Sequence, residues 1–207
     1  MWPIFRPFLR FIMFFEIAGL PPLTALVQAG ITLAMWLLLT HLSPGLFGPM
    51  SFNITVLGFI TSGLVLRRSA SRRRSRKHGH PLANLLSLAI WLAAAVLCLA
   101  TNNPRWIQHM FTLIPVLFAI ACLIDIWDGE GTFSAVTWPG EEMASFRPAL
   151  ARVFLLKHVA LALLNETLIA LTHPSTWLVF LALLPVFQHF VNSALTTTVL
   201  VDRERGN

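Results

Sequence analysis

Ionisable and amide side chains within two long apolar segments, residues 151–172 and 175–200, have the types and spacing to carry chemistry. The five candidates are His158, Asn165, Glu166, His189 and Asn192. Such groups are costly in hydrocarbon and usually face the interior of a helical bundle, where they bind ions or relay protons. Three interpretations are open: a polar contact between helices, ligation of a metal or haem, and a path for protons or a substrate.

The two histidines are expected to lie at the same depth. The turn between the segments centres between His173 and Pro174, and His158 and His189 are equally far from it. At a rise of ~1.5 Å per residue, both lie roughly 23 Å below the outer end. Stripes of small and polar residues follow helical spacing on both segments, and we expect these stripes to meet. They are His158, Ala162 and Asn165 on the first segment, and His189, Asn192 and Thr196 on the second.

The paired imidazoles also set the expectation for a cofactor. His158 and His189 are weak candidate ligands for a metal or a haem, because two histidines alone do not define a site. The ~8–10 Å interaxial distance of packed helices leaves little room for a porphyrin. We therefore predict no cofactor, and a haem-b electron carrier ligated by these two histidines stays as an alternative.

Glu166 is the acidic residue in the outer half of the predicted spans. An isolated carboxylate in lipid would be protonated, because desolvation disfavours its charged form. Arg105 and His109 are the basic residues near its level. The sequence therefore predicts either an ion pair with one of these two residues or a protonated group available for proton coupling, and favours the pair.

Pro115 and Pro185 lie inside two of the apolar segments, at similar distances from the outer face. Each removes a helical hydrogen bond and should kink its helix. Kinks at matching depth can shape a cavity beside Glu166, or they can simply accommodate packing. The sequence alone favours packing.

A further pattern covers about 50 residues around the last two segments. Its residues are, in chain order, Glu141, Glu142, Arg147, Phe154, His158, His189 and Asn192. This order resembles the motifs of the CAAX-protease-type intramembrane hydrolases, with the Glu-to-Arg and His-to-Asn spacings each differing by one residue. The resemblance implies a catalytic set in which Glu142 activates water and His158 and His189 act as base and oxyanion partners. An intramembrane hydrolase is therefore the enzymatic alternative.

The elements that must position these residues are apolar helices of membrane length. Hydrophobic residues make up 56% of the chain and charged residues 12%, against about 25% charged in soluble domains. This composition excludes a soluble enzyme, a disordered tail and a secreted disulfide scaffold. About 20 apolar residues cross a bilayer as a helix. We predict an all-α polytopic bundle of six helices over residues 22–42, 48–66, 81–101, 107–127, 151–172 and 175–200.

Basic residues set the predicted orientation. Seven of them follow the second predicted span: Arg67, Arg68, Arg72, Arg73, Arg74, Arg76 and Lys77. If this loop is cytoplasmic, fourteen of the fifteen Lys and Arg residues lie inside and Arg105 lies outside. We therefore expect a multi-pass inner-membrane protein with both termini in the cytoplasm. We expect the loop to contact anionic lipid headgroups and not nucleic acid, because no aromatic residue interleaves the run.

Tryptophans extend the same pattern. Trp106 and Trp177 lie near the predicted outer interface, and Trp2 and Trp127 lie near the inner one. Tryptophan is enriched at both membrane interfaces. The sequence therefore predicts that these four side chains form aromatic belts.

Three segments lie outside the predicted spans. Residues 1–21 are apolar but interrupted by two arginines, and we expect an interfacial helix there rather than a signal peptide or a seventh span. Residues 128–148 should form a long cytoplasmic loop, and residues 201–207 a cytoplasmic tail. The six spans, residues 22–200, should form a single membrane domain.

No nucleotide-binding, zinc-binding or phosphate-cradling motif occurs in the sequence. Apart from the hydrolase-like fragment, the chain offers no converging acid, base and nucleophile. We therefore expect a non-enzymatic transport, assembly or membrane-anchor subunit with a polar seam between the last two helices. Its expected partners are the lipid bilayer and, as a candidate, another membrane subunit.

Overall fold

The computed structural model describes the chain from Gly19 to Glu204 with gaps, and every regular element in the described part is helical. The described residues are 19–42, 50–73, 92–93, 96, 100–101, 103–129, 131–138, 141 and 143–204. The predicted interfacial segment therefore lies almost entirely outside them, as do most of the third predicted span, Glu142 and the end of the tail. The predicted all-α class is confirmed for the described part of the chain.

Within the described part of the chain, four helical segments are long and apolar enough to cross a membrane. They are Leu23–His41, Pro104–Asp128, Ala144–Leu171 and Pro174–Val199. They correspond to the first, fourth, fifth and sixth predicted spans. Large apolar side chains such as Leu123, Leu156 and Leu163 are exposed on their outer faces, as expected of surfaces that face lipid.

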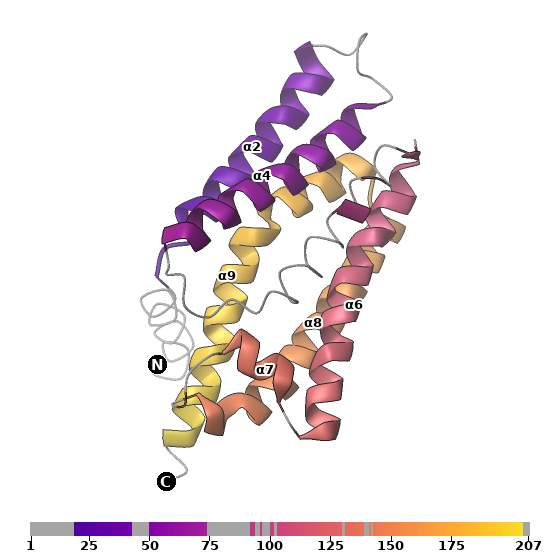
Figure 1. The fold of residues 1–207 in the computed structure, drawn as a ribbon. Helices are drawn as coiled ribbons and strands as arrows, with labels where there is room; N and C mark the ends of the chain where they lie inside the picture. The colour runs from indigo at the N-terminus through magenta and orange to yellow at the C-terminus, as the bar shows by residue number, and fades with distance from the viewer. Residues whose placement is uncertain are drawn as a thin grey trace, which may run out of the picture.

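The first span consists of α2 (Leu23–Leu37), which continues as a π-helix, η1 (Leu38–Leu42). It pairs with α4 (Ser51–Arg73), and the two helices run antiparallel beside each other (Figure 1). Two glycines of α4 permit this close approach, because a Cβ atom at Gly58 would collide with the side chain of Met35. At Gly63 a Cβ atom would lie 2.6 Å from Nε2 of Gln28.

Helix α4 corrects one boundary of the predicted basic loop. The apolar part of α4, Ser51–Leu66, is shorter than the four long segments, but the helix continues through Arg73. Arginine, serine and alanine are all compatible with helix, and no glycine or proline lies between Leu66 and Gly79. Arg67, Arg68, Arg72 and Arg73 are therefore helical rather than in a loop, while residues 74–77 lie outside the described part.

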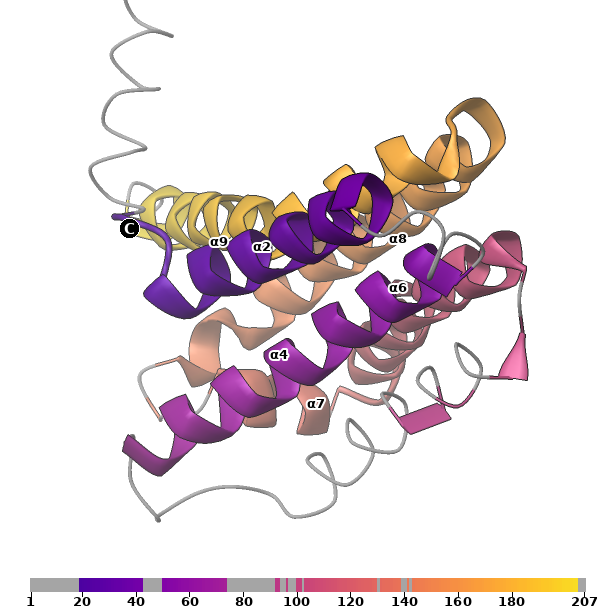
Figure 2. The same cartoon turned by 90° about the horizontal axis from the view of Figure 1, so that it is seen from above.

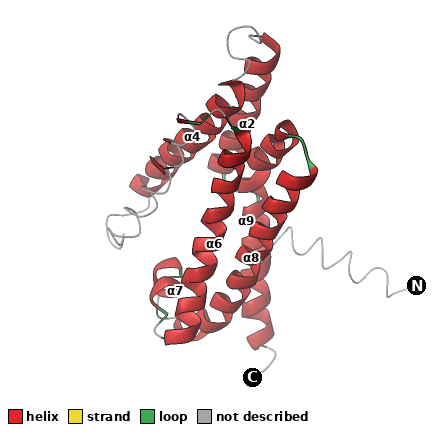
Figure 3. Ribbon diagram, turned by 90° about the vertical axis from the view of Figure 1, so that its right-hand side faces the viewer, coloured by secondary structure: helices red, strands yellow, loops and turns green. Residues whose placement is uncertain are grey.

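The remaining spans are α6 (Pro104–Asp128), α8 (Arg147–Leu171) and α9 (Pro174–Glu204). Helices α6 and α8 share the most extensive contact in the molecule, and α8 turns back into α9 at His173. Figure 2 shows α9 lying next to α2, so that α9 joins the α2–α4 pair to the α6–α8 pair. The hairpin between α8 and α9 and the short helix α7 (Thr132–Thr137) lie at opposite ends of this bundle (Figures 1 and 3).

An aromatic cluster forms the core where α4, α6 and α9 meet. The Trp177 ring is fully buried, with its centroid 5.4 Å from that of Phe111 and 5.8 Å from that of Phe52. The prediction that Trp177 marks the outer interface is therefore wrong, because its side chain points into the protein. Trp106 and Trp127 are exposed at opposite ends of α6, as an interfacial position requires.

The predicted loop of residues 128–148 contains two short helical elements, α7 and a 3-10 turn, η3 (Ala144–Phe146). Gly129 and Gly131 adopt φ angles of 72° and 62°, which turn the chain back from the end of α6. The segment then packs on a second hydrophobic cluster centred on Cys122, Leu150 and Phe154. This end of the bundle is therefore closed by folded chain.

Candidate functional site

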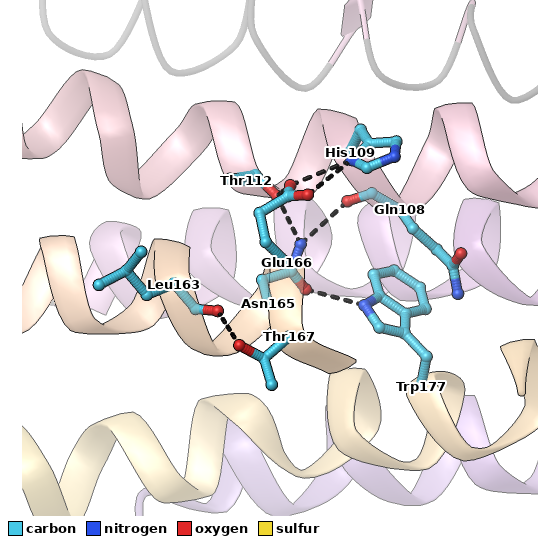
Figure 4. A network of polar contacts seen from close by, with 8 residues as sticks. All are labelled: Gln108, His109, Thr112, Leu163, Asn165, Glu166, Thr167 and Trp177. Atoms are coloured by element: carbon cyan, nitrogen blue, oxygen red, sulfur yellow. Dashed lines mark hydrogen bonds and ion pairs between the residues drawn. The ribbon is translucent and has the colours of Figure 1, made fainter. Parts of the chain in front are cut away.

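A network of polar side chains joins α6, α8 and α9 in the half of the bundle near the α8–α9 hairpin (Figure 4). The Asn165 side chain is almost fully buried, and its amide group donates to the backbone carbonyl of Gln108 at 3.1 Å and to the Thr112 hydroxyl at 2.7 Å. Its carbonyl oxygen accepts from Nε1 of Trp177 at 2.8 Å. One amide side chain therefore connects three helices with all of its groups used.

The network continues to Glu166, the next residue of α8. The hydroxyl of Thr112 donates to the Glu166 carboxylate, and Nδ1 of His109 lies 3.0 Å from each carboxylate oxygen. The sequence predicted Arg105 or His109 as the partner of Glu166, and the structure pairs Glu166 with His109. Both side chains of this pair are about half exposed, at 43% for Glu166 and 49% for His109.

A cavity of about 460 Å³ lies between α2, α4, α6, α8 and α9, and α7 contributes to one end. Its apolar lining is rich in phenylalanine and includes both kink prolines, Pro115 and Pro185. Its polar lining residues are Gln28, Thr137, Lys157, His158, Asn165, Gln188 and Asn192. The volume is within the range of ligand sites, roughly 300–1,000 Å³. Both prolines therefore lie at a cavity, and Glu166 is not among its lining residues.

Lys157 provides the charge of this cavity. Its ammonium group donates to Oδ1 of Asn192 on α9 at 3.0 Å and lies 4.6 Å from the centroid of the Phe154 ring. Within the described part of the chain, no carboxylate forms an ion pair with it. Among the described residues, the partners of the cation are a neutral amide and a ring face.

His158 has different neighbours from those that the sequence predicted. Its ring stacks on Phe118 of α6, with centroids 5.2 Å apart and planes at 20°, and Phe154 lies 6.4 Å away. Among the described residues its buried Nδ1 has no hydrogen-bond partner. At this level, the hydrogen bond between α8 and α9 is donated by Lys157 to Asn192. Successive residues of a helix point about 100° apart, so Lys157 and His158 contact different neighbours.

The predicted seam residues have two different surroundings, and Asn165 belongs to both. Asn165 and Glu166 are part of the network, whereas His158, Asn165 and Asn192 line the cavity. His189 is not among the lining residues, and its ring contacts the neighbouring Phe190. The pairing of the two imidazoles as ligands or as a catalytic set stays a prediction, and Glu142 of the hydrolase-like set lies outside the described residues.

Three residues of the site were missed by sequence reasoning. Thr112 lies three residues after His109 on α6 and so shares a helix face with it, a spacing that could have identified it, whereas Gln108 contributes its backbone carbonyl, for which the sequence gives no signal. Lys157 lies within the fifth predicted span, and its side chain lines the cavity. Only the packing of α8 against α9 reveals this direction.

The described residues contain no group of three or more His, Cys, Asp or Glu side chains that could hold a metal ion. No family model matches the chain, and neither a curated protein nor a solved structure matches it. The chemistry of the cavity and of the network is therefore the basis for a functional argument.

Proposed function

We propose that this chain is a non-enzymatic subunit of a bacterial-type inner membrane that binds an amphiphilic molecule within the bilayer and takes part in its transport. The observation that supports the proposal most is the cavity of about 460 Å³ between the helices, with phenylalanine-rich walls and a few polar groups. Mostly apolar pockets with a small number of placed polar groups are typical of ligand sites. An amphiphile satisfies both kinds of surface.

The proposed topology has six spans, with an interfacial helix over residues 1–21 and both termini in the cytoplasm. It rests on the placement of fourteen of the fifteen Lys and Arg residues on one side. In this orientation α7 faces the cytoplasm and the α8–α9 hairpin faces outward. The basic residues 67–77 then contact anionic headgroups of the inner leaflet, and another membrane subunit is a candidate partner on the apolar outer surface.

A cavity-filling substitution tests whether the cavity is the binding site. Leu161→Trp places a larger side chain at a residue that lines the cavity, and Leu163→Trp makes the same change at a residue of α8 that is 64% exposed. Hexadecanol, a neutral amphiphile, is titrated against the full-length protein in detergent, and bound adducts are measured by native mass spectrometry. We expect Leu161→Trp to weaken binding at least about tenfold and Leu163→Trp to leave it unchanged.

Two results would contradict the proposal. One is the absence of any amphiphile adduct on the unmodified protein. The other is equal binding by the Leu161→Trp and Leu163→Trp variants, which would place the ligand on the outer surface rather than in the cavity.

A further inference from the structure

Four of the seven polar residues that line the cavity gather at one end of it. Measured along the helices from the turn between His173 and Pro174, Lys157 of α8 lies within about 3 Å in level of both Gln188 and Asn192 of α9, at ~1.5 Å per residue. His158 adjoins this level, and its Nδ1 has no hydrogen-bond partner among the described residues. These four residues form what we call the polar pole.

The polar pole carries a positive charge without a balancing acid. An ammonium group has three N–H donors, of which the Asn192 oxygen takes one. A cation removed from water is stabilised when an anion pairs with it, and here no carboxylate of the described residues does so. The pole is therefore complementary to an anionic group.

The rest of the cavity is complementary to a hydrocarbon chain. Its walls away from the pole include Phe59, Phe111, Leu181 and Leu184. The lining extends from Lys157 to Asn165 on α8 and from Phe180 to Asn192 on α9, which is about 12 to 18 Å at ~1.5 Å per residue. A single leaflet of a ~30 Å hydrocarbon core has about this thickness.

We infer that the ligand is a single-chain anionic amphiphile, with its carboxylate or phosphate headgroup on Lys157 and its tail directed toward Phe111 and Leu181. This inference rests on the proposed function and specifies its ligand. The headgroup accepts hydrogen bonds from the Lys157 ammonium group. The tail occupies the phenylalanine-rich part of the cavity.

The test compares three ligands of equal chain length on the full-length protein. They are palmitate, palmitoyl lysophosphatidate and neutral hexadecanol. We expect both anions to bind at least about tenfold more tightly than hexadecanol. The anion that binds with the higher affinity shows whether the site prefers a carboxylate or a phosphate headgroup.

Variants assign the preference to Lys157. Lys157→Met should bring the anions to the affinity of hexadecanol, and Lys157→Arg should retain the preference. Arg152→Met removes a cation from the same helix at a residue that does not line the cavity, and it should behave like the unmodified protein. Retained hexadecanol binding by Lys157→Met shows that this variant is folded.

The outcomes separate the two proposals. If hexadecanol binds as tightly as the anions, or if Lys157→Met keeps the anion preference, the headgroup inference is overturned and the cavity remains a ligand site. If none of the three ligands binds the unmodified protein, the proposed function itself fails.

Discussion

At the scale of single residues, Asn165 shows how the protein fixes one amide orientation. Nε1 of Trp177 can only donate a hydrogen bond, and the backbone carbonyl of Gln108 can only accept one. The side-chain oxygen of Asn165 must therefore face Trp177, and its side-chain nitrogen must face Gln108. The second N–H of Asn165 reaches the Thr112 oxygen, which leaves the Thr112 hydrogen for Glu166. Donors and acceptors thus alternate from Trp177 to Glu166.

Removing this amide should destabilise the bundle. Asn165→Ala leaves the buried Trp177 N–H group without its acceptor, at a cost of about 1–3 kcal/mol. Thermal unfolding of the detergent-solubilised protein measures the loss. Thr167→Val is the matched control, because Thr167 is exposed on the same helix and bonds only to its own helix at the Leu163 carbonyl. Equal melting temperatures for the two variants would contradict a stabilising role for the network.

At the scale of elements, α7 depends on a side chain from another helix. Its N-cap residue is Gly131, which has no side chain to accept from the first N–H groups. Asp125 of α6 takes this role: its carboxylate accepts from Phe133 N–H at 2.9 Å and from the N–H and hydroxyl of Ser134 at 2.5 Å each. Asp125 is nearly fully buried, and its negative charge lies at the positive end of α7.

Asp125→Ala should therefore release α7 from the end of the bundle. Loss of these hydrogen bonds costs about 1–3 kcal/mol locally, so that amide hydrogens of residues 132–137 exchange roughly 10- to 100-fold faster. Hydrogen exchange with mass spectrometry measures the change. Asp128→Ala is the control, since Asp128 is an exposed carboxylate near the end of the same helix. Unchanged protection of α7 in Asp125→Ala would show that packing alone holds it.

At the scale of the whole molecule, the two ends of the bundle differ in character. One end carries the α8–α9 hairpin, and the other carries the folded segment around α7, on which Trp138 packs against Phe154 with centroids 4.7 Å apart. The polar pole of the cavity lies toward the α7 end, because Phe133 and Thr137 line the cavity there with Lys157. An anionic ligand with its headgroup at this pole would thus be oriented toward the proposed cytoplasmic side.

Reporter fusions test the orientation of the whole chain. A reporter that is active only outside the cytoplasm should be inactive when fused after Trp138 or after Asn207, and active when fused after His173. The physical reason is the excess of Lys and Arg on the α7 side. The His173 fusion is the positive control for export and expression. Activity of the fusion at Asn207 would overturn the proposed topology.

The sequence by itself predicted the membrane class and most of the span positions. Four predicted spans coincide with long apolar helices, because the free energy of placing a segment in hydrocarbon depends mainly on its own residues. The levels of residues along a helix were also accessible, since the rise per residue is fixed. Arg105 and His109 were the two candidate partners of Glu166 on this basis, and the structure pairs Glu166 with His109.

Only the tertiary structure decided which way each side chain points. Trp177 and Lys157 are of residue types that are common at membrane interfaces, and their positions along the helices are near the predicted interfaces. Yet the Trp177 side chain is buried against Asn165, and the Lys157 side chain lines the cavity. His158 turns toward Phe118 on α6 rather than toward α9. The rotation of a helix about its axis is set by the shapes of all its neighbours together, and a pattern along one chain segment does not contain those shapes.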